Sequence, residues 1–95
     1  MKPKRENAAH FLAVDGTIET RHTKPNLAEL QAGVGGYIER VGCIWNGHRC
    51  TMYVNEEGKL HGLPFNIVAT AAFVNAFPQV QDVIVGPVVI LEGWR

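Results

Sequence analysis

Residues 37–54 read YIERVGCIWNGHRCTMYV. Asn46-Gly47 divides this stretch into two halves rich in β-forming residues, and Asn-Gly favours a two-residue hairpin turn because both positions need a positive φ. Gly42 interrupts the first half, so we expect a bulge or bend there. The stretch predicts a long antiparallel hairpin.

Two further elements follow the hairpin. Asn55–Gly58 is rich in turn-forming residues, and Lys59-Leu60-His61 is predicted as a short third strand of the meander. Asn66 is placed to cap a second helix at Ile67–Ala76. This helix is apolar around most of its circumference, so we expect the sheet to cover one side and a partner subunit the other.

The C-terminal segment 82–92 is predicted as the last strand. Its nearly continuous apolar pattern indicates a central position in the sheet. Gly86-Pro87 conflicts with uninterrupted strand pairing, so we expect a bulge or short loop at that point.

A first helix precedes the hairpin. Asn26 and Glu29 have the spacing of a capping box, and the apolar side chains of Leu27, Leu30 and Val34 follow on one helical stripe. The glycines at positions 33, 35 and 36 are expected to end this helix.

Two short strand-like runs, 11–14 and 17–21, stand before the first helix. Asp15-Gly16 between them predicts a small hairpin with a type I′ turn, and a single strand with a bulge at Gly16 is the alternative.

These elements predict an α+β fold in the order ββ-α-βββ-α-β. We expect an antiparallel-dominated sheet of about five to six strands with two helices. Ninety-five residues suit one domain. We place this domain at residues 11–95, after a flexible basic arm at residues 1–10 that carries Lys2, Lys4 and Arg5.

The charge balance bears on the partners. Nine Lys and Arg offset nine Asp and Glu, but without the three cations of the arm the body has six basic and nine acidic residues. An acidic body disfavours nucleic-acid binding. No apolar run approaches the roughly 20 residues of a membrane span, and the basic start is followed by polar Glu6-Asn7, unlike a signal peptide. We therefore expect a cytoplasmic protein without a membrane partner.

The inventory of reactive groups is small. The chain has no serine, and Cys50 with His48 or His61 lacks the third group that orients a catalytic pair. Glu56 and Glu57 are adjacent in a predicted turn, where their side chains diverge. We therefore expect no enzyme, no cofactor and no metal site, although an adventitious zinc site near Cys43 and Cys50 is an alternative.

The candidate ligand site combines two glycine-bearing bends with nearby polar side chains. We expect main-chain amides at these bends and the start of the second helix to face a shared recess that binds an anionic, nucleotide-like ligand. The alternatives are that the first bend only stops a helix and that Asn66 only caps one. The candidate ligand-binding residues are Gly35, Gly36, Tyr37, Arg40, Lys59, His61, Gly62 and Asn66.

Two aromatic residues are candidates for protein contacts. Trp45 stands beside the predicted hairpin tip, and Phe73 lies on the apolar second helix. Exposed aromatic side chains often anchor interfaces, although packing within the domain is the alternative for Trp45. Together with the apolar helix, they lead us to expect a homo-oligomer.

Three segments carry a family resemblance: LQAGVGGYIE at 30–39, YVNEEGKLHGLPFNIVAT at 53–70 and DVIVGPV at 82–88. The chain resembles a family of small uncharacterised domains that are common in phages, prophages and mobile elements. The resemblance spans about residues 26 to 91 and implies a phage-encoded protein that acts in the host cytoplasm. Small phage domains often counter host defence. This expectation rests on analogy and not on the chemistry of a site.

Three functions follow from these observations. The first hypothesis is a phage accessory protein that sequesters a small nucleotide-like ligand and so blunts antiviral signalling. The alternative is a protein-interaction module that inhibits a host protein directly through the Trp45 tip. A hydrolase is the least expected, and a pocket lined by His22, His61 and Glu39 together would revive it.

Overall fold

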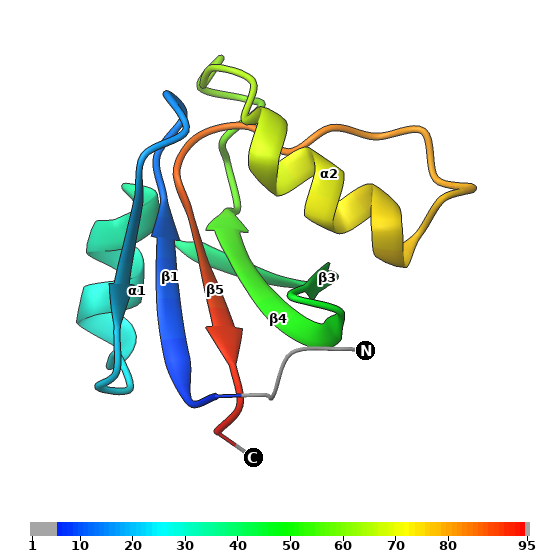
Figure 1. The fold of residues 1–95 in the computed structure, drawn as a ribbon. Coiled ribbons are helices and arrows are strands. Elements are labelled where there is room, and N and C mark those ends of the chain that lie inside the picture. The colour runs from blue at the N-terminus through cyan, green and yellow to red at the C-terminus, as the bar shows by residue number, and fades with distance from the viewer. Residues whose placement is uncertain (1–5, 95) are drawn as a thin grey trace.

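The computed structural model describes residues 6–94 and contains one five-stranded sheet with two helices (Figure 1). All strand pairs are antiparallel, and the strand order is β2-β1-β5-β4-β3. The fold is therefore α+β, as the sequence predicts. The elements in chain order are β1 (Ala8–Leu12), β2 (Ile18–Arg21), α1 (Leu27–Val34), β3 (Ile38–Trp45), β4 (His48–Asn55), α2 (Ile67–Ala76) and β5 (Val88–Glu92).

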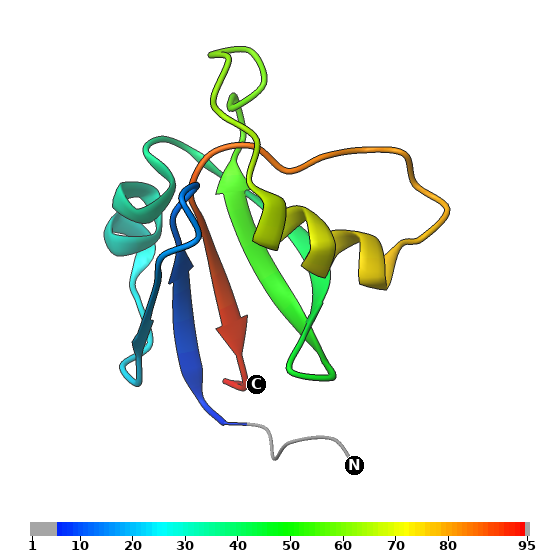
Figure 2. The same cartoon turned by 45° about the horizontal axis from the view of Figure 1, so that its top comes forward.

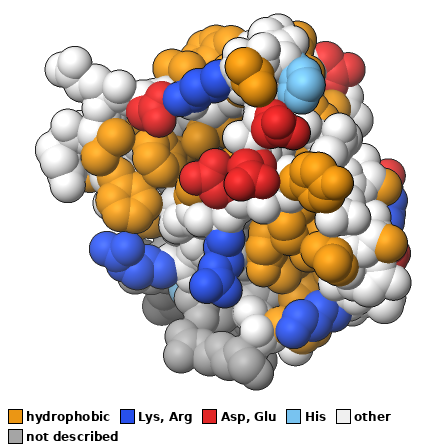
Figure 3. Space-filling view, turned by 180° about the vertical axis from the view of Figure 1, so that it is seen from behind, with side chains coloured by type: hydrophobic (Ala, Val, Ile, Leu, Met, Phe, Trp, Pro, Cys, Tyr) orange, Lys and Arg blue, Asp and Glu red, His pale blue; other side chains and the backbone are white. Residues whose placement is uncertain are grey.

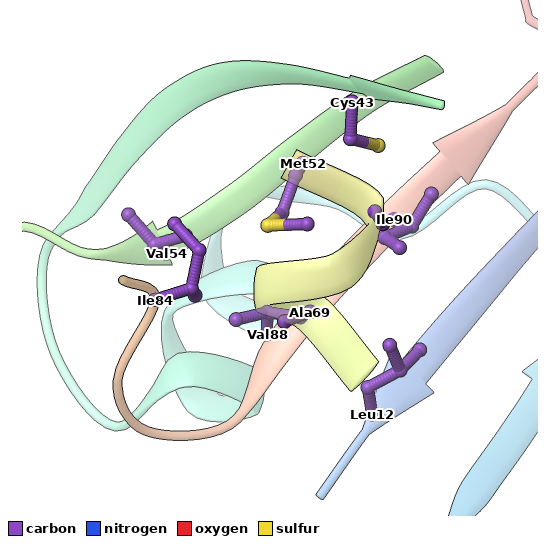
Figure 4. Close-up of a cluster of buried hydrophobic side chains, with 9 residues drawn as sticks. Leu12, Cys43, Met52, Val54, Ala69, Ile84, Val88 and Ile90 are labelled. Carbon is purple, nitrogen blue, oxygen red and sulfur yellow. The ribbon is translucent and has the colours of Figure 1, made fainter. Parts of the chain in front are cut away.

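The two helices lie on opposite faces of the sheet (Figure 2). α1 packs Leu30 and Val34 against Ala9 and Val89, which alternate with neighbours that point to the other face. α2 covers a larger apolar cluster (Figure 4), whose buried members are Leu12, Cys43, Met52, Val54, Ala69, Ala72, Ile84, Val88 and Ile90. β5 contributes to both clusters, which explains its continuous apolar pattern and confirms its central position.

Local signals place the caps and the central turn correctly. The capping box between Asn26 and Glu29 is present, and Gly35 ends α1 with a left-handed φ of 78°. Asn46 and Gly47 have φ values of 52° and 76°, as the hairpin turn requires. Gly33, which we expected to help end the helix, lies inside α1 instead.

Two strand predictions are wrong. Residues 59–61 form no third strand but lie in a turn, because His61 N–H donates to the Glu57 carbonyl at 2.9 Å. The expected interruption at Gly86-Pro87 is confirmed, since Gly86 has a φ of 76°, but the last strand begins only at Val88 and does not include residues 82–87. Before that point, Val85 forms a single antiparallel bridge to Phe65.

Gly42 is not a bulge. It pairs with Thr51 in an uninterrupted β3–β4 register. A Cβ at this position would lie 3.3 Å from the ring of Phe77, so the glycine makes room for that ring beside an edge strand.

The N-terminal hairpin exists, but its limits differ from those expected. Leu12 pairs with Ile18, so the loop spans residues 13–17, and Gly16 has a φ of 93° while Asp15 does not have a positive φ. The turn is therefore not type I′. β1 starts at Ala8, so residues 8–10 belong to the domain and not to an arm. The basic residues expected in the arm lie outside the described residues. Neither helix within residues 6–94 combines the length and apolar character needed to cross a membrane.

Candidate functional site

A groove with acidic edges opens on the side of the sheet where β3 ends the strand order (Figure 3). Figure 3 shows acidic side chains gathered at the centre of this face, with hydrophobic patches on both sides of them. The groove, which we call the acidic groove, has a volume of about 160 Å³. Its lining residues are Glu39, Val41, Val54, Asn55, Glu56, Lys59, Leu60, Phe73, Asp82, Val83, Ile84 and Val85.

Five parts of the chain build the acidic groove, including residues 82–85 before β5. β3 and β4 supply Val41 and Val54 on the α2 side of the sheet, and α2 supplies Phe73. The turn after β4 supplies Leu60, whose side chain is 80% exposed. An apolar floor therefore lies under a rim of charged side chains.

The only cation of the groove lining is already paired. Lys59 Nζ forms an ion pair with Asp82, and the hydrogen bond from Lys59 lowers the pKa of the Asp82 carboxyl, with help from the Val83 N–H. Glu39 and Glu56 form no ion pair with any residue in the 6–94 range. Three carboxylates thus face one ammonium group, so the groove attracts cations.

A second recess lies between the end of α1 and the turn after β4, and we call it the tyrosine recess. Its volume is about 450 Å³, and its lining residues are Gln31, Ala32, Gly35, Gly36, Tyr37, Asn55, Glu57 and His61. Tyr37 is 67% exposed. His61 Nε2 lies 3.9 Å from Glu57 Oε1. The recess borders the C-terminal end of α1, where the helix dipole is negative.

The structure brings only part of the predicted ligand site together. Gly35, Gly36, Tyr37 and His61 share the tyrosine recess, whereas Lys59 lines the acidic groove. Arg40 is exposed on β3 and lines neither of these two recesses.

The prediction that the glycine bends offer unpaired main-chain amides is wrong. The N–H groups of Gly35 and Gly36 donate to the Gln31 carbonyl at 2.8 and 3.1 Å, and the Gly62 N–H donates to the Lys59 carbonyl at 3.1 Å. These bonds close the helix and the turn. No glycine amide of the candidate set is left for an anion.

Asn66 is a structural residue, in agreement with the alternative given for it. It is 1% exposed, and its Oδ1 accepts the N–H of Ala69 at 3.0 Å. Its Nδ2 donates to the carbonyls of Gly86 at 2.9 Å and Leu12 at 3.4 Å. A side chain that is buried and fully bonded cannot meet a ligand.

The two predicted interaction residues lie on different surfaces. Phe73 is half-buried, lines the acidic groove and contacts the ring of Phe77 at 5.3 Å between centroids. Trp45 is also half-buried, and its ring lies tilted against that of His10, with 5.3 Å between the centroids. It borders an open groove of about 390 Å³ beside α2, lined by Ile44, Trp45, Asn46, Ile67, Val68, Ala71, Ala72 and Asn75.

Sequence reasoning missed a polar network that joins β2, β1 and β5. His10 Nδ1 lies 2.9 Å from Thr20 Oγ1, and His10 Nε2 lies 2.9 Å from Glu92 Oε1. Both ring nitrogens of His10 therefore have a polar partner, and which of them donates depends on the tautomer. A Glu at the end of an otherwise apolar strand is the signal that could have revealed this network.

The network connects a hydroxyl, an imidazole and a carboxylate, but the recesses described here do not include Thr20. The pocket that would have revived a hydrolase is not formed either. Glu39 lines the acidic groove, His61 lines the tyrosine recess, and His22 lines none of the recesses described for residues 6–94.

The two cysteines face each other across the hairpin. Cys43 pairs with Cys50 in the β3–β4 register, and no disulfide joins them. Burial raises the pKa of the Cys43 thiol to about 12, and the neighbouring Cys50 contributes to the rise. Within the described residues, no group of three or more His, Cys, Asp or Glu side chains is placed to hold a metal ion.

Comparison with known proteins identifies the family of the chain but no activity. No curated protein and no solved structure matches it. One family model, described as a domain of unknown function, DUF3846, matches residues 9–94. That range includes every described helix and strand except the first residue of β1. The chain therefore belongs to the DUF3846 family of domains of unknown function.

Proposed function

We propose that the protein is a non-enzymatic interaction module that binds a basic segment of another protein in the acidic groove. The observation that carries this proposal is the apolar floor beneath Glu39 and Glu56, two carboxylates without an ion pair among residues 6–94. A Lys or Arg side chain fits such a groove, because its apolar stem can pack on the floor while its cationic head pairs with the carboxylates.

The size of the groove supports a single side chain as its occupant. Pockets for whole small molecules hold about 300–1,000 Å³. The acidic groove has about 160 Å³. Leu60 on its rim is 80% exposed, and it offers an apolar contact for residues next to the bound cation.

The biological setting of this proposal comes from the family resemblance. A phage-encoded module that acts in the host cytoplasm would bind and inhibit a basic site on a host defence protein. Direct inhibition of a host protein is thus retained from the expectations above, with the acidic groove in place of the Trp45 tip as the contact surface.

The proposal is tested with short peptides in which one Arg or Lys is flanked by apolar residues, and with the same peptides carrying Glu instead. We expect the basic peptides to bind, with an affinity that falls as salt is raised. The double variant Glu39→Gln, Glu56→Gln should weaken binding about tenfold or more, which corresponds to about 1.4 kcal/mol.

Glu19→Gln is the matched control, because Glu19 is an exposed carboxylate on β2 at the opposite edge of the sheet. It should leave the affinity unchanged. Equal binding of the Glu peptides, or equal affinity of the double variant and the wild type, would exclude the acidic groove as the site.

Sequestration of a nucleotide-like ligand stays a second candidate, favoured by Tyr37 and His61 in one recess of about 450 Å³. An aromatic side chain can stack on a base, but Glu57 and the end of α1 oppose an anionic group there. Calorimetric titration with cyclic nucleotides and ADP-ribose derivatives tests it, with Tyr37→Ala as the variant. No heat with any of them would count against this candidate.

A further inference from the structure

The outer face of α2 is uncharged, and two of its three exposed residues are apolar. Ile67, Ala71 and Asn75 are exposed at a spacing of four residues, which places them on one side of the helix. Ile67 is 69% exposed. The opposite side carries Ala69 and Ala72, which are buried in the core. No Asp, Glu, Lys or Arg occurs anywhere from residue 63 to residue 81.

We propose that this face packs against the same face of a second copy of the chain, as an antiparallel helix pair centred on Ala71. In such a pair a two-fold axis passes by Ala71, and Ile67 of one copy lies opposite Asn75 of the other, because both are four residues from the centre. The small Ala71 side chain allows the helices to approach closely.

The charge pattern identifies a second copy as the occupant. An acidic or basic partner would find no counter-charge on this face, and an anionic membrane surface would need Lys or Arg beside the apolar residues. Two copies of a neutral face bring no like charges together. The antiparallel arrangement also places the opposite ends of the two helix dipoles side by side.

Exposed apolar residues also stand on either side of α2 in the sequence. Phe65 precedes the helix and is 49% exposed, and Val80 follows it and is 40% exposed. A standard interface takes about 800 Å² from each partner, which is a large share of a total surface of 5830 Å². The outer side of α2 exposes only three residues, which is a small contact by that measure, so we expect a weak dimer with a micromolar dissociation constant.

This inference is independent of the proposed function. Phe73, which lines the acidic groove, is two residues from Ala71 and so lies about 200° around the helix from it. A dimer through Ala71 leaves the acidic groove open. Loss of the dimer and loss of peptide binding are therefore separate outcomes.

The test is sedimentation of the full chain from about 5 to about 500 µM, a range that brackets micromolar dissociation. The wild type should shift from monomer to dimer. Ala71→Glu and Ala71→Arg should each be monomeric, because residue 71 faces its own copy and like charges then meet at the axis. An equimolar mixture of the two variants should dimerise again through the opposite charges.

Ala32→Glu and Ala32→Arg are the matched controls, since Ala32 is an exposed alanine on α1. They should dimerise as the wild type does. Three results would each overturn the proposal: a wild type that is monomeric up to the highest concentration, a single Ala71 variant that still dimerises, or a mixture that stays monomeric. The first of these needs no variant, so the test does not depend on how the variants fold.

Discussion

Two asparagines cap the two helices, and their surroundings differ. Asn26 caps α1 at an exposed position, where its Oδ1 accepts the N–H of Glu29 at 2.8 Å. Asn66 caps α2 but is buried, and its Nδ2 also donates to the carbonyls of Gly86 and Leu12. The second asparagine therefore joins α2 to the segment before β5 and to the end of β1.

Replacement of each asparagine by alanine measures this difference. Loss of an exposed cap costs about 1 kcal/mol of unfolding free energy, which we expect for Asn26→Ala. Asn66→Ala should cost about 3 kcal/mol, because it also leaves buried carbonyls without a donor. Urea denaturation of the two variants checks the prediction. Equal costs would show that the contacts of Asn66 Nδ2 contribute nothing measurable.

The caps could be predicted from sequence, and the additional contacts of Asn66 could not. A cap depends on residues three positions apart, so its signal is local. The contacts to Leu12 and Gly86 join positions 54 and 20 residues apart. The glycine bends failed as an anion site for a related reason. The pattern located the bends but did not reveal that their amides are used within the bends themselves.

At the scale of elements, α1 is fitted closely to the central strand. Gly33 lies within α1, and a Cβ there would be 2.8 Å from Val89 Cγ2 and 3.1 Å from the Phe11 ring. Val89 is fully buried on β5 and, as a β-branched residue, has little rotamer freedom. The glycine therefore sets how near the helix approaches the sheet.

This close fit reverses the usual effect of alanine in a helix. Gly→Ala in a helix normally stabilises by up to about 1 kcal/mol, while overpacking a core costs about 1–3 kcal/mol. We expect Gly33→Ala to destabilise the protein by about 1 kcal/mol net. Ala32→Gly on the exposed side should destabilise by a similar amount through propensity alone. Chemical denaturation of both variants checks this, and a stabilised Gly33→Ala would mean that α1 can move away from β5.

Elements with strong local turns were predicted best. The central hairpin follows from Asn46-Gly47, and both helices follow from their caps. The predicted third strand at 59–61 failed because β-forming tendency competes there with local turn bonds, including Leu63 N–H to the Gly58 carbonyl at 2.9 Å. The sequence of a short polar segment with alternating character does not show whether it forms a strand or a turn.

At the scale of the whole molecule, the strand order determines the candidate site. β5, the last strand, inserts between β1 and β4, and this leaves β3 at an edge beside α2. The acidic groove then collects residues from β3, β4, the turn after β4, α2 and the segment before β5. The sequence predicted a central last strand, but it did not show which five segments would meet, because that depends on pairings between distant parts of the chain.

The two proposals combine into a prediction about the assembled molecule. A dimer through Ala71 would carry two acidic grooves, one on each copy, so it could hold two basic segments at once. Linked binding of this kind can raise the apparent affinity by about 10²–10⁴ when both sites can be reached together.

A surface densely coated with a basic peptide should therefore retain the wild type at least tenfold more tightly than Ala71→Glu. The same peptide free in solution, where only one groove can be filled by each molecule, should bind both proteins equally. Surface plasmon resonance and fluorescence anisotropy make the two measurements. If the dimer and the groove are each verified but the coated surface shows no difference, the two grooves point in opposite directions, and the dimer serves stability instead of binding.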